Sequence, residues 1–230
     1  MPLRAANAFV LRTYPLRESD KIVSFFTREY GKCRGVARAA RRPKSKFGAT
    51  LETLTQVRVQ FFEREGHDLA NIDHCELVAS MLGASVDLAA STGIALMAEV
   101  ADRMLPEREV NDAVFRLLEL VLGEMRRAPA AGVWSPLTYY LVWMVRLGGF
   151  LPNFTVWNRE PATLNLVQAM IKNPLPALPA ETTAQAAGVP GRELRRWLKD
   201  CLQDHIEAGL KSWPLVAELE PHAEFSRPHP

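Results

Sequence analysis

The spacing of apolar residues changes once along the chain, near Leu77, and this change constrains the fold more than any other feature. Before it, residues 54–63 alternate strictly, with Val57, Val59 and Phe61 facing one way and the intervening side chains the other. Such alternation is typical of a β-strand that is buried on one face. After it, apolar residues recur three and four positions apart, as they do on amphipathic helices. The sequence therefore predicts an α+β chain with strands first and helices second.

Four further segments before Leu77 have the β-branched and aromatic content of short strands. They lie at residues 8–11, 21–27, 32–39 and 69–75. Five short strands, with a long connection between the third and the fourth, are the count of a five-stranded OB-type β-barrel. An SH3-like barrel would give a similar pattern. We expect this barrel to be a domain of residues 1–79.

Residues 80–230 are expected to form an all-α helical domain. One apolar stripe runs from Ile94 to Leu105, and a second from Val114 to Met125 with Asn111 as its N-cap. Ser135 and Pro136 are typical of a helix start, and Gly148-Gly149 of a helix end, so residues 137–147 are predicted to form a helix. Because this helix is apolar nearly all round, we expect it at the centre of a bundle.

The C-terminal part of the chain differs in composition. Residues 158–190 are rich in proline and alanine and are expected to hold a short helix at 164–171 followed by an irregular connector. A last helix is predicted at 192–208, within a segment, residues 191–209, that packs on the bundle. Gly209 closes it.

Positive charge is concentrated in the N-terminal part. The whole chain has a net charge of +2, but residues 1–47 hold 12 basic and 3 acidic residues. The densest stretch, residues 31–48, contains seven basic residues and no acid. They are Lys32, Arg34, Arg38, Arg41, Arg42, Lys44 and Lys46.

The basic stretch begins as a strand and continues as a loop that contains Pro43 and ends at Gly48. A strand that leads into a basic loop places its charges at one rim of a small sheet, where a polyanion can bind. The seven basic residues are therefore candidates for phosphate contacts with DNA. The alternative is a solvated surface loop without a ligand.

Three aromatic residues flank these charges, and each is a candidate to stack on nucleic-acid bases: Tyr14, Tyr30 and Phe47. Packing in the barrel core is the competing role for each, because a small barrel needs large apolar side chains. Phe25 and Phe26 are adjacent in a predicted strand, so one of them must face out of the barrel and can cover the helical part.

Few features of the sequence indicate a metal, cofactor or catalytic site. The three cysteines, Cys33, Cys75 and Cys201, include no CxxC pair, which argues against zinc and suits a reducing cytoplasm. The chain has no HExxH, GxSxG or phosphate-binding glycine loop. Glu18 and Asp20 could hold a magnesium ion, but one close carboxylate pair is a weak signal, and solvation or pairing with Lys21 is the favoured explanation. We expect no catalytic residue, no metal and no cofactor.

No targeting signal is expected from the sequence. Its N-terminus lacks the apolar core of a signal peptide. The most apolar stretch, residues 134–151, is interrupted by Pro136 and Arg146 and is expected to be a core helix and not a membrane span. A cytoplasmic, nucleoid-associated protein is expected.

Several segments resemble, in order and spacing, the RecO family of bacterial DNA-repair proteins. These segments are AFVL at 8–11, ESDKIV at 18–23, FTREYGK at 26–32, VARAARR at 36–42 and SKFGATL at 45–51. GFLPNF at 149–154 also resembles the motif at the end of the family's central helix. The resemblance implies an N-terminal OB fold, a helical body and often a zinc-binding lobe after that motif. Residues 155–178 contain no cysteine, so we expect the lobe, at 158–190, to be metal-free and degenerate or absent.

The same resemblance implies a recombination mediator that binds single- and double-stranded DNA and anneals complementary strands. With the RecR partner, such proteins displace single-strand-binding protein so that the RecA recombinase can load. The C-terminal tail of single-strand-binding protein is expected to bind in an apolar groove of the helical domain. Two alternatives remain: a peptide-binding adaptor whose basic loop contacts an acidic protein, and a nuclease-like enzyme.

Overall fold

A computed structural model describes residues 3–63, 66–84, 87–152, 160–206 and 208–221 of the 230-residue chain. The chain divides into two compact units, residues 1–116 and 117–230. The first unit holds all the strands together with the first helix, so it extends beyond the domain of residues 1–79 that the sequence suggests. That domain boundary stays a prediction.

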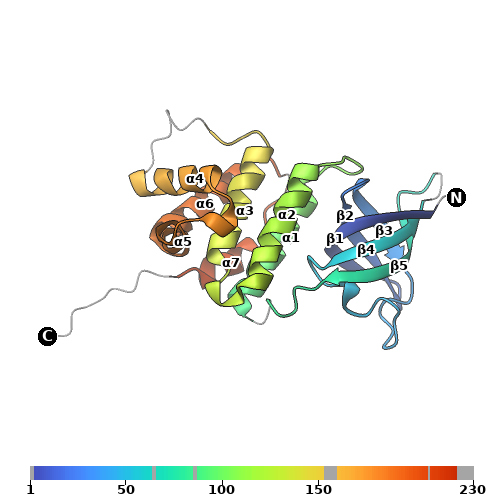
Figure 1. Ribbon diagram of the computed structural model, residues 1–230. Helices are drawn as coiled ribbons and strands as arrows, with labels where there is room; N and C mark the ends of the chain where they lie inside the picture. Colours follow the sequence, from blue (N-terminus) through green and yellow to red (C-terminus); the bar gives the residue numbers. More distant parts are fainter. Residues whose placement is uncertain (1–2, 64–65, 85–86, 153–159, 207, 222–230) are drawn as a thin grey trace. The chain divides into compact units, whose positions relative to one another are not determined.

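The first unit is built on a closed barrel of five strands (Figure 1). The strands are β1 (Leu3–Leu16), β2 (Asp20–Thr27), β3 (Gly31–Ala37), β4 (Gln56–Phe62) and β5 (Ala70–Ala79). Their order is β1-β2-β3-β5-β4, and β4 pairs back onto β1. The pair β3–β5 is parallel, whereas the other four pairs are antiparallel. This topology confirms the predicted OB-type barrel.

The barrel core is filled by the residues that the alternating pattern predicts. Val57, Val59 and Phe61 of β4 are buried in it, and Phe25 meets Phe61 edge-on with 5.4 Å between ring centroids. Phe26 is also buried but lies outside the barrel, where its ring is 5.8 Å from that of Phe115. The prediction that one of the two adjacent phenylalanines faces outward is therefore confirmed.

Strand β1 is much longer than the predicted residues 8–11, because it pairs with β2 along one half and with β4 along the other. The register to β2 shifts between Val10 and Arg12, as at a β-bulge, which lets the strand bend around the barrel. The long connection from β3 to β4 contains a 3-10 helix, η1 (Gly48–Leu51), that the sequence pattern did not reveal.

Two helices begin in the first unit. Helix α1 (Leu88–Met104) is capped by Asp87, whose carboxylate accepts a hydrogen bond from the Ala90 amide at 3.1 Å. Helix α2 (Asp112–Arg127) begins there and runs into the second unit. The Asn111 side chain accepts a bond from the Val114 amide at 3.1 Å, which confirms the predicted cap.

The second unit is helical. Beside the rest of α2 it contains η2 (Pro129–Ala131), α3 (Trp134–Leu147), α4 (Pro161–Lys172), η3 (Leu175–Ala177), α5 (Ala180–Ala187), α6 (Val189–Gln203) and α7 (Trp213–Leu219). Helix α3 contacts α4, α5 and α6, as expected for the central helix of a bundle (Figure 1). It ends at Leu147, just before Gly148, as predicted, but it begins at Trp134, so Ser135 lies inside the helix and is not its cap.

Other helix predictions in this unit were wrong. Residues 180–187, assigned to an irregular connector, form α5, and α6 ends at Gln203 and not at residue 208. Helix α7 was not foreseen. Residues 153–154 of the GFLPNF motif lie outside the described part. None of the helices in the described residues is long and apolar enough to cross a bilayer.

A buried ion pair ties the C-terminal segment to the second unit. The Arg195 and Glu220 side chains are both fully buried, and Arg195 Nε lies 2.7 Å from Glu220 Oε1. Arg195 Nη1 also donates to the Thr138 hydroxyl at 2.8 Å and to the Ala186 carbonyl at 2.6 Å. Burial lowers the pKa of the guanidinium, and the Glu220 carboxylate opposes that shift. The pair thus joins α3, α5 and α6 to the residue that follows α7.

We expect Glu220→Ala to lower the free energy of unfolding by about 3–5 kcal/mol, because it leaves the Arg195 charge buried without its partner. Glu218→Ala removes an exposed carboxylate two residues away and serves as the control, with an expected change of less than about 0.5 kcal/mol. Urea denaturation of the full chain measures both. Equal stability of the two variants would contradict the role given to the ion pair.

Candidate nucleic-acid interface

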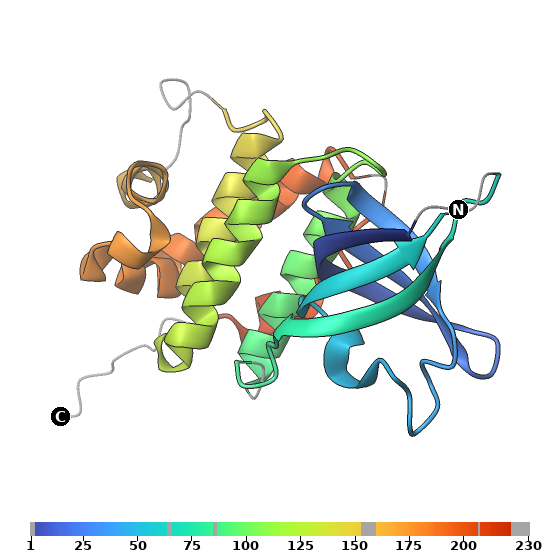
Figure 2. The same ribbon diagram turned by 45° about the vertical axis from the view of Figure 1, so that its right-hand side comes forward.

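The connection from β3 to η1 is held against the β1–β2 turn by three hydrogen bonds. Asp20 Oδ1 accepts a bond from the Ala39 amide at 2.8 Å. The Ser19 carbonyl accepts one from the Arg41 amide at 2.9 Å, and the Arg17 carbonyl accepts one from Arg41 Nη1 at 3.0 Å. Figure 2 shows both loops, in blue shades, at the same end of the barrel. The loop position is therefore fixed at its base.

Asp20 is the anchor of this arrangement. The hydrogen bond from the Ala39 amide lowers the pKa of its carboxyl group below the ordinary value, and the Ser19 hydroxyl acts in the same direction. The positive charges of Arg17 and Arg38 add to the effect. The carboxylate is thus ionised at neutral pH and already occupied by structural contacts, which accounts for it without a magnesium ion.

Phe47 anchors the far end of the loop. Its side chain is 2% exposed and belongs to the barrel core, beside residues such as Leu51 and Phe61. The Thr50 hydroxyl donates to the Phe47 carbonyl at 2.5 Å and holds the start of η1. The buried ring offers no face to a base, so we no longer propose Phe47 as a stacking residue.

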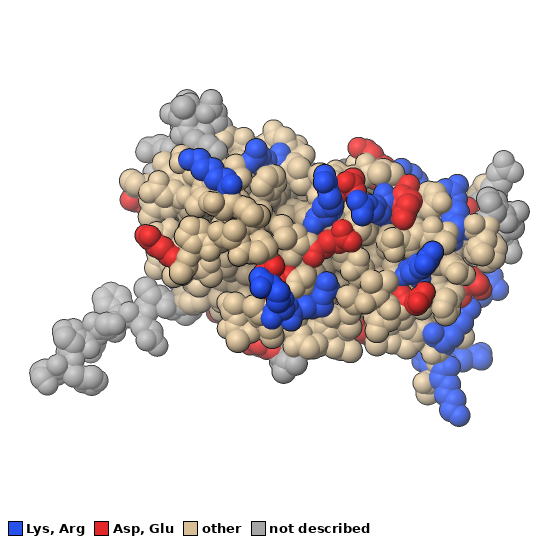
Figure 3. Space-filling model, viewed as in Figure 1, with Lys and Arg blue, Asp and Glu red and all other residues tan. Residues whose placement is uncertain are grey.

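Exposed basic residues gather on the anchored loop and the adjacent turn. We call this group the basic end; it comprises Arg17, Arg38, Arg41, Arg42, Lys44 and Lys46. In Figure 3, Lys and Arg side chains project beneath the barrel, where the β3–η1 loop lies in Figure 1. Arg17 lies outside the basic stretch of residues 31–48, and only the pairing of the two loops brings this residue beside the others.

Few carboxylates neutralise the basic end: the Asp20 carboxylate attracts Arg17 and Arg38, and the direct contacts are weak. Lys46 Nζ lies 3.6 Å from Asp73 Oδ1, and both side chains are about half exposed, so this contact is weak. Arg38 Nη2 reaches only the Asn71 side-chain oxygen, at 3.5 Å. Within the described residues, the remaining members form no ion pair with a carboxylate. The basic end is therefore free to receive external anions.

The structure places the other two predicted residues apart from the basic end. Lys32 and Arg34 lie nearer the start of β3, where Lys32 Nζ donates to the Asp102 carbonyl at 2.5 Å. Arg34 Nε lies 2.7 Å from Glu107 Oε1. Both side chains thus interact with the end of α1 and the segment after it. Five of the seven predicted residues are brought together, and these two are not.

The two tyrosines differ in exposure. Tyr30 packs edge-on against Phe61 at 5.9 Å, and the Arg4 guanidinium lies 4.6 Å from its ring centroid. Tyr14 is 38% exposed, with the Arg12 guanidinium 4.7 Å from its ring centroid. Tyr14 therefore remains the better candidate for stacking on a base.

Metal-binding side chains do not gather in the described part of the chain. There, no group of three or more His, Cys, Asp or Glu residues could hold a metal ion. Cys33 and Cys75 are buried, and burial raises the pKa of both thiols, that of Cys75 to about 12. These two thiols are therefore poor nucleophiles and poor metal ligands at neutral pH.

Comparison with known proteins points to one family. Residues 1–81 match the family described as recombination protein O, N terminal, and residues 85–159 match recombination protein O, C terminal. A protein of Koribacter versatilis named DNA repair protein RecO is 50% identical over 151 residues, 66% of this chain and 61% of that protein. One of the same name from Streptomyces avermitilis is 39% identical over 163 residues, 67% of this chain and 64% of that protein. The chain thus matches less than two thirds of the length of these relatives.

We expect Asp20→Ala to speed hydrogen exchange of the Ala39 and Arg41 amides about tenfold, because it removes the loop anchor. Asp20→Asn keeps an acceptor oxygen and should change exchange much less. Because the pKa of Asp20 is lowered, its contribution is present at neutral pH and is lost only as the pH falls through that lowered value. Hydrogen-exchange mass spectrometry of the full chain provides the measurement. Unchanged exchange in Asp20→Ala would contradict the anchoring role.

Proposed function

This chain belongs to the RecO family, and we propose that it is a DNA-binding recombination mediator in DNA repair. Its curated relatives carry the name DNA repair protein RecO. The single observation that supports DNA binding by this chain is the basic end, with its exposed and nearly unpaired cations.

The basic end would bind the sugar-phosphate backbone of single- and double-stranded DNA. Phosphate contacts do not depend on base sequence, and their strength falls with salt because counterions are released. Long arginine and lysine side chains on an anchored loop can follow a strand without a fixed register. We propose Tyr14 as an additional stacking contact, worth about 1–3 kcal/mol if a base covers its ring.

The same basic surface would also promote strand annealing. Two complementary strands repel each other through their phosphates, and a shared positive surface reduces that repulsion. The strands must remain mobile to find their register, so binding has to be weak and reversible. Exposed side chains without rigid partners meet this requirement. No bond is made or broken in this proposal.

The proposed partners are those of a mediator. RecR would join the chain, and the C-terminal tail of single-strand-binding protein would dock on the helical domain. RecA would then load on the strand that is released. Support for these partners comes from membership of the RecO family.

We expect the variant Arg38→Ala, Arg41→Ala, Arg42→Ala to weaken binding of single-stranded DNA about equally for all sequences. The slope of log K against log salt should fall by about 2–3, since each lost phosphate contact contributes about 0.7–0.9. Fluorescence anisotropy with two unrelated oligonucleotides, over a series of salt concentrations, measures the slope.

The matched control replaces three arginines outside the basic end: Arg28, Arg58 and Arg116. Arg28 and Arg116 both pair with Asp112, and all three are exposed, so the control removes the same charge with little effect on folding. We expect it to keep most of the wild-type slope. If both variants lose the same slope, the net charge and not the basic end governs binding.

A second expectation separates a mediator from an adaptor. The full chain should accelerate annealing of complementary oligonucleotides, both bare and coated with single-strand-binding protein, and the triple variant should lose most of this acceleration. Fluorescence quenching between labelled strands follows the reaction. A separate reaction of the full chain with labelled DNA and magnesium detects any cleavage. Tight peptide binding without annealing would favour the adaptor.

A further inference from the structure

A hollow of about 280 Å³ lies on the outer face of β1, β2 and β3 in the first unit, and we call it the β1–β3 hollow. Ser24 and Arg34 line it and alternate with core residues along β2 and β3, so their side chains point out of the barrel. Asp102 at the end of α1 and Glu107 after that helix also line it. The volume lies just below the range of about 300–1,000 Å³ that is typical of drug-sized ligands, so the hollow suits a smaller ligand.

Two cations and two carboxylates line the β1–β3 hollow. Arg34 Nε lies 2.7 Å from Glu107 Oε1, and the two side chains are 46% and 41% exposed, so solvent and ligands can reach both. Lys32 Nζ donates to the main-chain carbonyl of Asp102 and not to its carboxylate. Because the charges balance, neither a free anion nor a free cation is favoured. The hollow suits a neutral group that both donates and accepts hydrogen bonds.

The Asp102 carboxylate is oriented but has spare capacity. The Ser24 hydroxyl, which is 2% exposed, donates to Asp102 Oδ1 at 2.6 Å. Within the described residues, Asp102 forms no ion pair, and its other carboxylate oxygen accepts no hydrogen bond. A carboxylate can accept several hydrogen bonds, and lysine and arginine can donate several. Asp102 thus offers an acceptor to a ligand, and Lys32 and Arg34 offer donors.

An accessible aromatic ring borders the same hollow. Tyr14 lines it and is 38% exposed. The Arg12 guanidinium lies over the ring, 4.7 Å from its centroid, and occupies one face. The other face is left for a planar ligand. Proteins hold the bases of single-stranded nucleic acids on aromatic rings of this kind.

The β1–β3 hollow is continuous with the basic end. Strand β1 runs from Tyr14 to the turn that holds Arg17, and β3 runs from Arg34 to the loop that begins with Arg38. At 3.2–3.4 Å per residue, the four positions from Arg34 to Arg38 span about 13 Å. A single strand whose phosphates contact the basic end can therefore place a base in the hollow.

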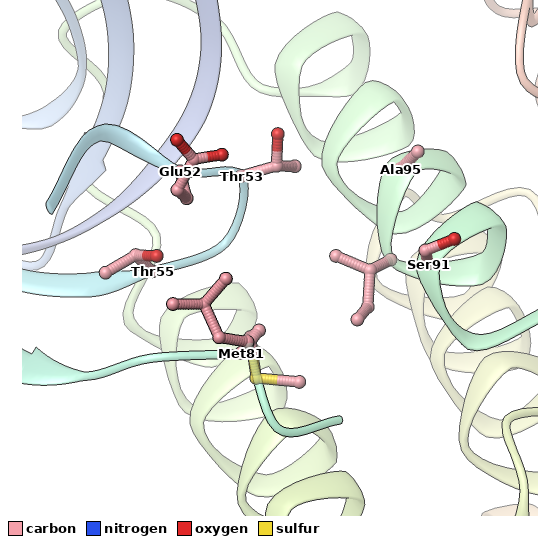
Figure 4. A pocket seen from close by; sticks show the side chains of 8 residues that line it. Glu52, Thr53, Thr55, Met81, Ser91 and Ala95 are labelled. Atoms are coloured by element: carbon pink, nitrogen blue, oxygen red, sulfur yellow. The ribbon is translucent and has the colours of Figure 1, made fainter. Parts of the chain in front are cut away.

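The other hollow described on the first unit, of about 210 Å³, lacks these features. In Figure 4, Thr55 and Met81 lie across from Ser91 and Ala95 of α1, with Glu52 at the edge. No basic side chain and no aromatic ring line it among the described residues. It therefore offers neither the paired donors and acceptors nor the stacking surface of the β1–β3 hollow.

We propose that the β1–β3 hollow binds one guanine base of single-stranded DNA. The base would stack on Tyr14. Its N1–H and 2-amino groups would donate to the Asp102 carboxylate, and its O6 and N7 atoms would accept from Lys32 or Arg34. This proposal rests on the proposed DNA binding and adds a base preference to it.

The hydrogen-bond pattern selects guanine among the four bases. Guanine presents two adjacent N–H donors to a carboxylate and two acceptors to a cation. Thymine has one donor between two acceptors, whereas adenine and cytosine have one amino group beside a ring nitrogen that a carboxylate repels. In duplex DNA the donors of guanine are paired with cytosine, so the preference is confined to unpaired strands.

The probes are short oligo-dT strands with one central dT, dG, dA, dC or deoxyinosine, and fluorescence anisotropy measures their binding to the full chain. We expect the dG strand to bind about tenfold tighter than the dT strand, and deoxyinosine, which lacks the 2-amino group, to lose most of this gain. Tyr14→Leu should weaken binding of the dG strand about tenfold.

Asp102→Asn keeps an acceptor for the Ser24 hydroxyl but removes the charge, and it should bind all the strands equally. Loss of a negative charge by itself strengthens DNA binding, so loss of the dG preference separates recognition of the base from a general charge effect. Glu76→Gln neutralises an exposed carboxylate on β5 and should keep the preference.

The variant Arg38→Ala, Arg41→Ala, Arg42→Ala should bind every strand more weakly but keep the ratio of dG to dT binding. Equal binding of all the strands by the wild-type chain would overturn the guanine site alone. Persistence of the dG preference in Asp102→Asn would overturn it equally. Absence of binding to any strand would overturn the proposed function together with the guanine site.

Discussion

Closure of the barrel is the constraint on which the rest of the first unit depends. It requires β3 to pair in parallel with β5, so the chain cannot return from β3 by a short hairpin and must cross the end of the barrel before it enters β4. The crossing segment has two tasks. It buries Phe47 and Leu51 in the core, and it carries Arg41, Arg42 and Lys44 into solvent. The same topology that removes open sheet edges thus also produces the exposed basic loop.

Environment, and not residue type, separates the seven basic residues of the stretch into two groups. Lys32 and Arg34 face the end of α1 and the segment after it, and there they find a carbonyl and a carboxylate of the same chain. Arg42 and Lys44 project from a loop where the nearest anchor, Asp20, is already occupied by main-chain and side-chain donors. The first group holds the unit together, whereas the second remains available to an outside anion.

The sequence was a good guide wherever a local pattern decides the structure. Alternation at residues 54–63 predicted β4, and the charge run predicted five of the basic residues that gather at one end. It was a poor guide where distant contacts decide. The partners of Lys32 and Arg34 lie about seventy positions away, and Arg17 joins the basic end only through the pairing of two loops. The proline-rich composition concealed α5, although Pro179 before it and Gly188 after it are ordinary helix boundaries.

The buried ring of Phe47 also limits how the loop can vary. Hydrogen bonds from the main-chain amides of Ala39 and Arg41 fix the start of the loop, and the core fixes it again at Phe47, so only residues 42–46 lie between two fixed points. An insertion there would lengthen a solvent-exposed span without moving either attachment. An insertion between Phe47 and Leu51 would instead pull one of the two side chains out of the core. Length variation within the connection from β3 to η1 should therefore be confined to residues 42–46.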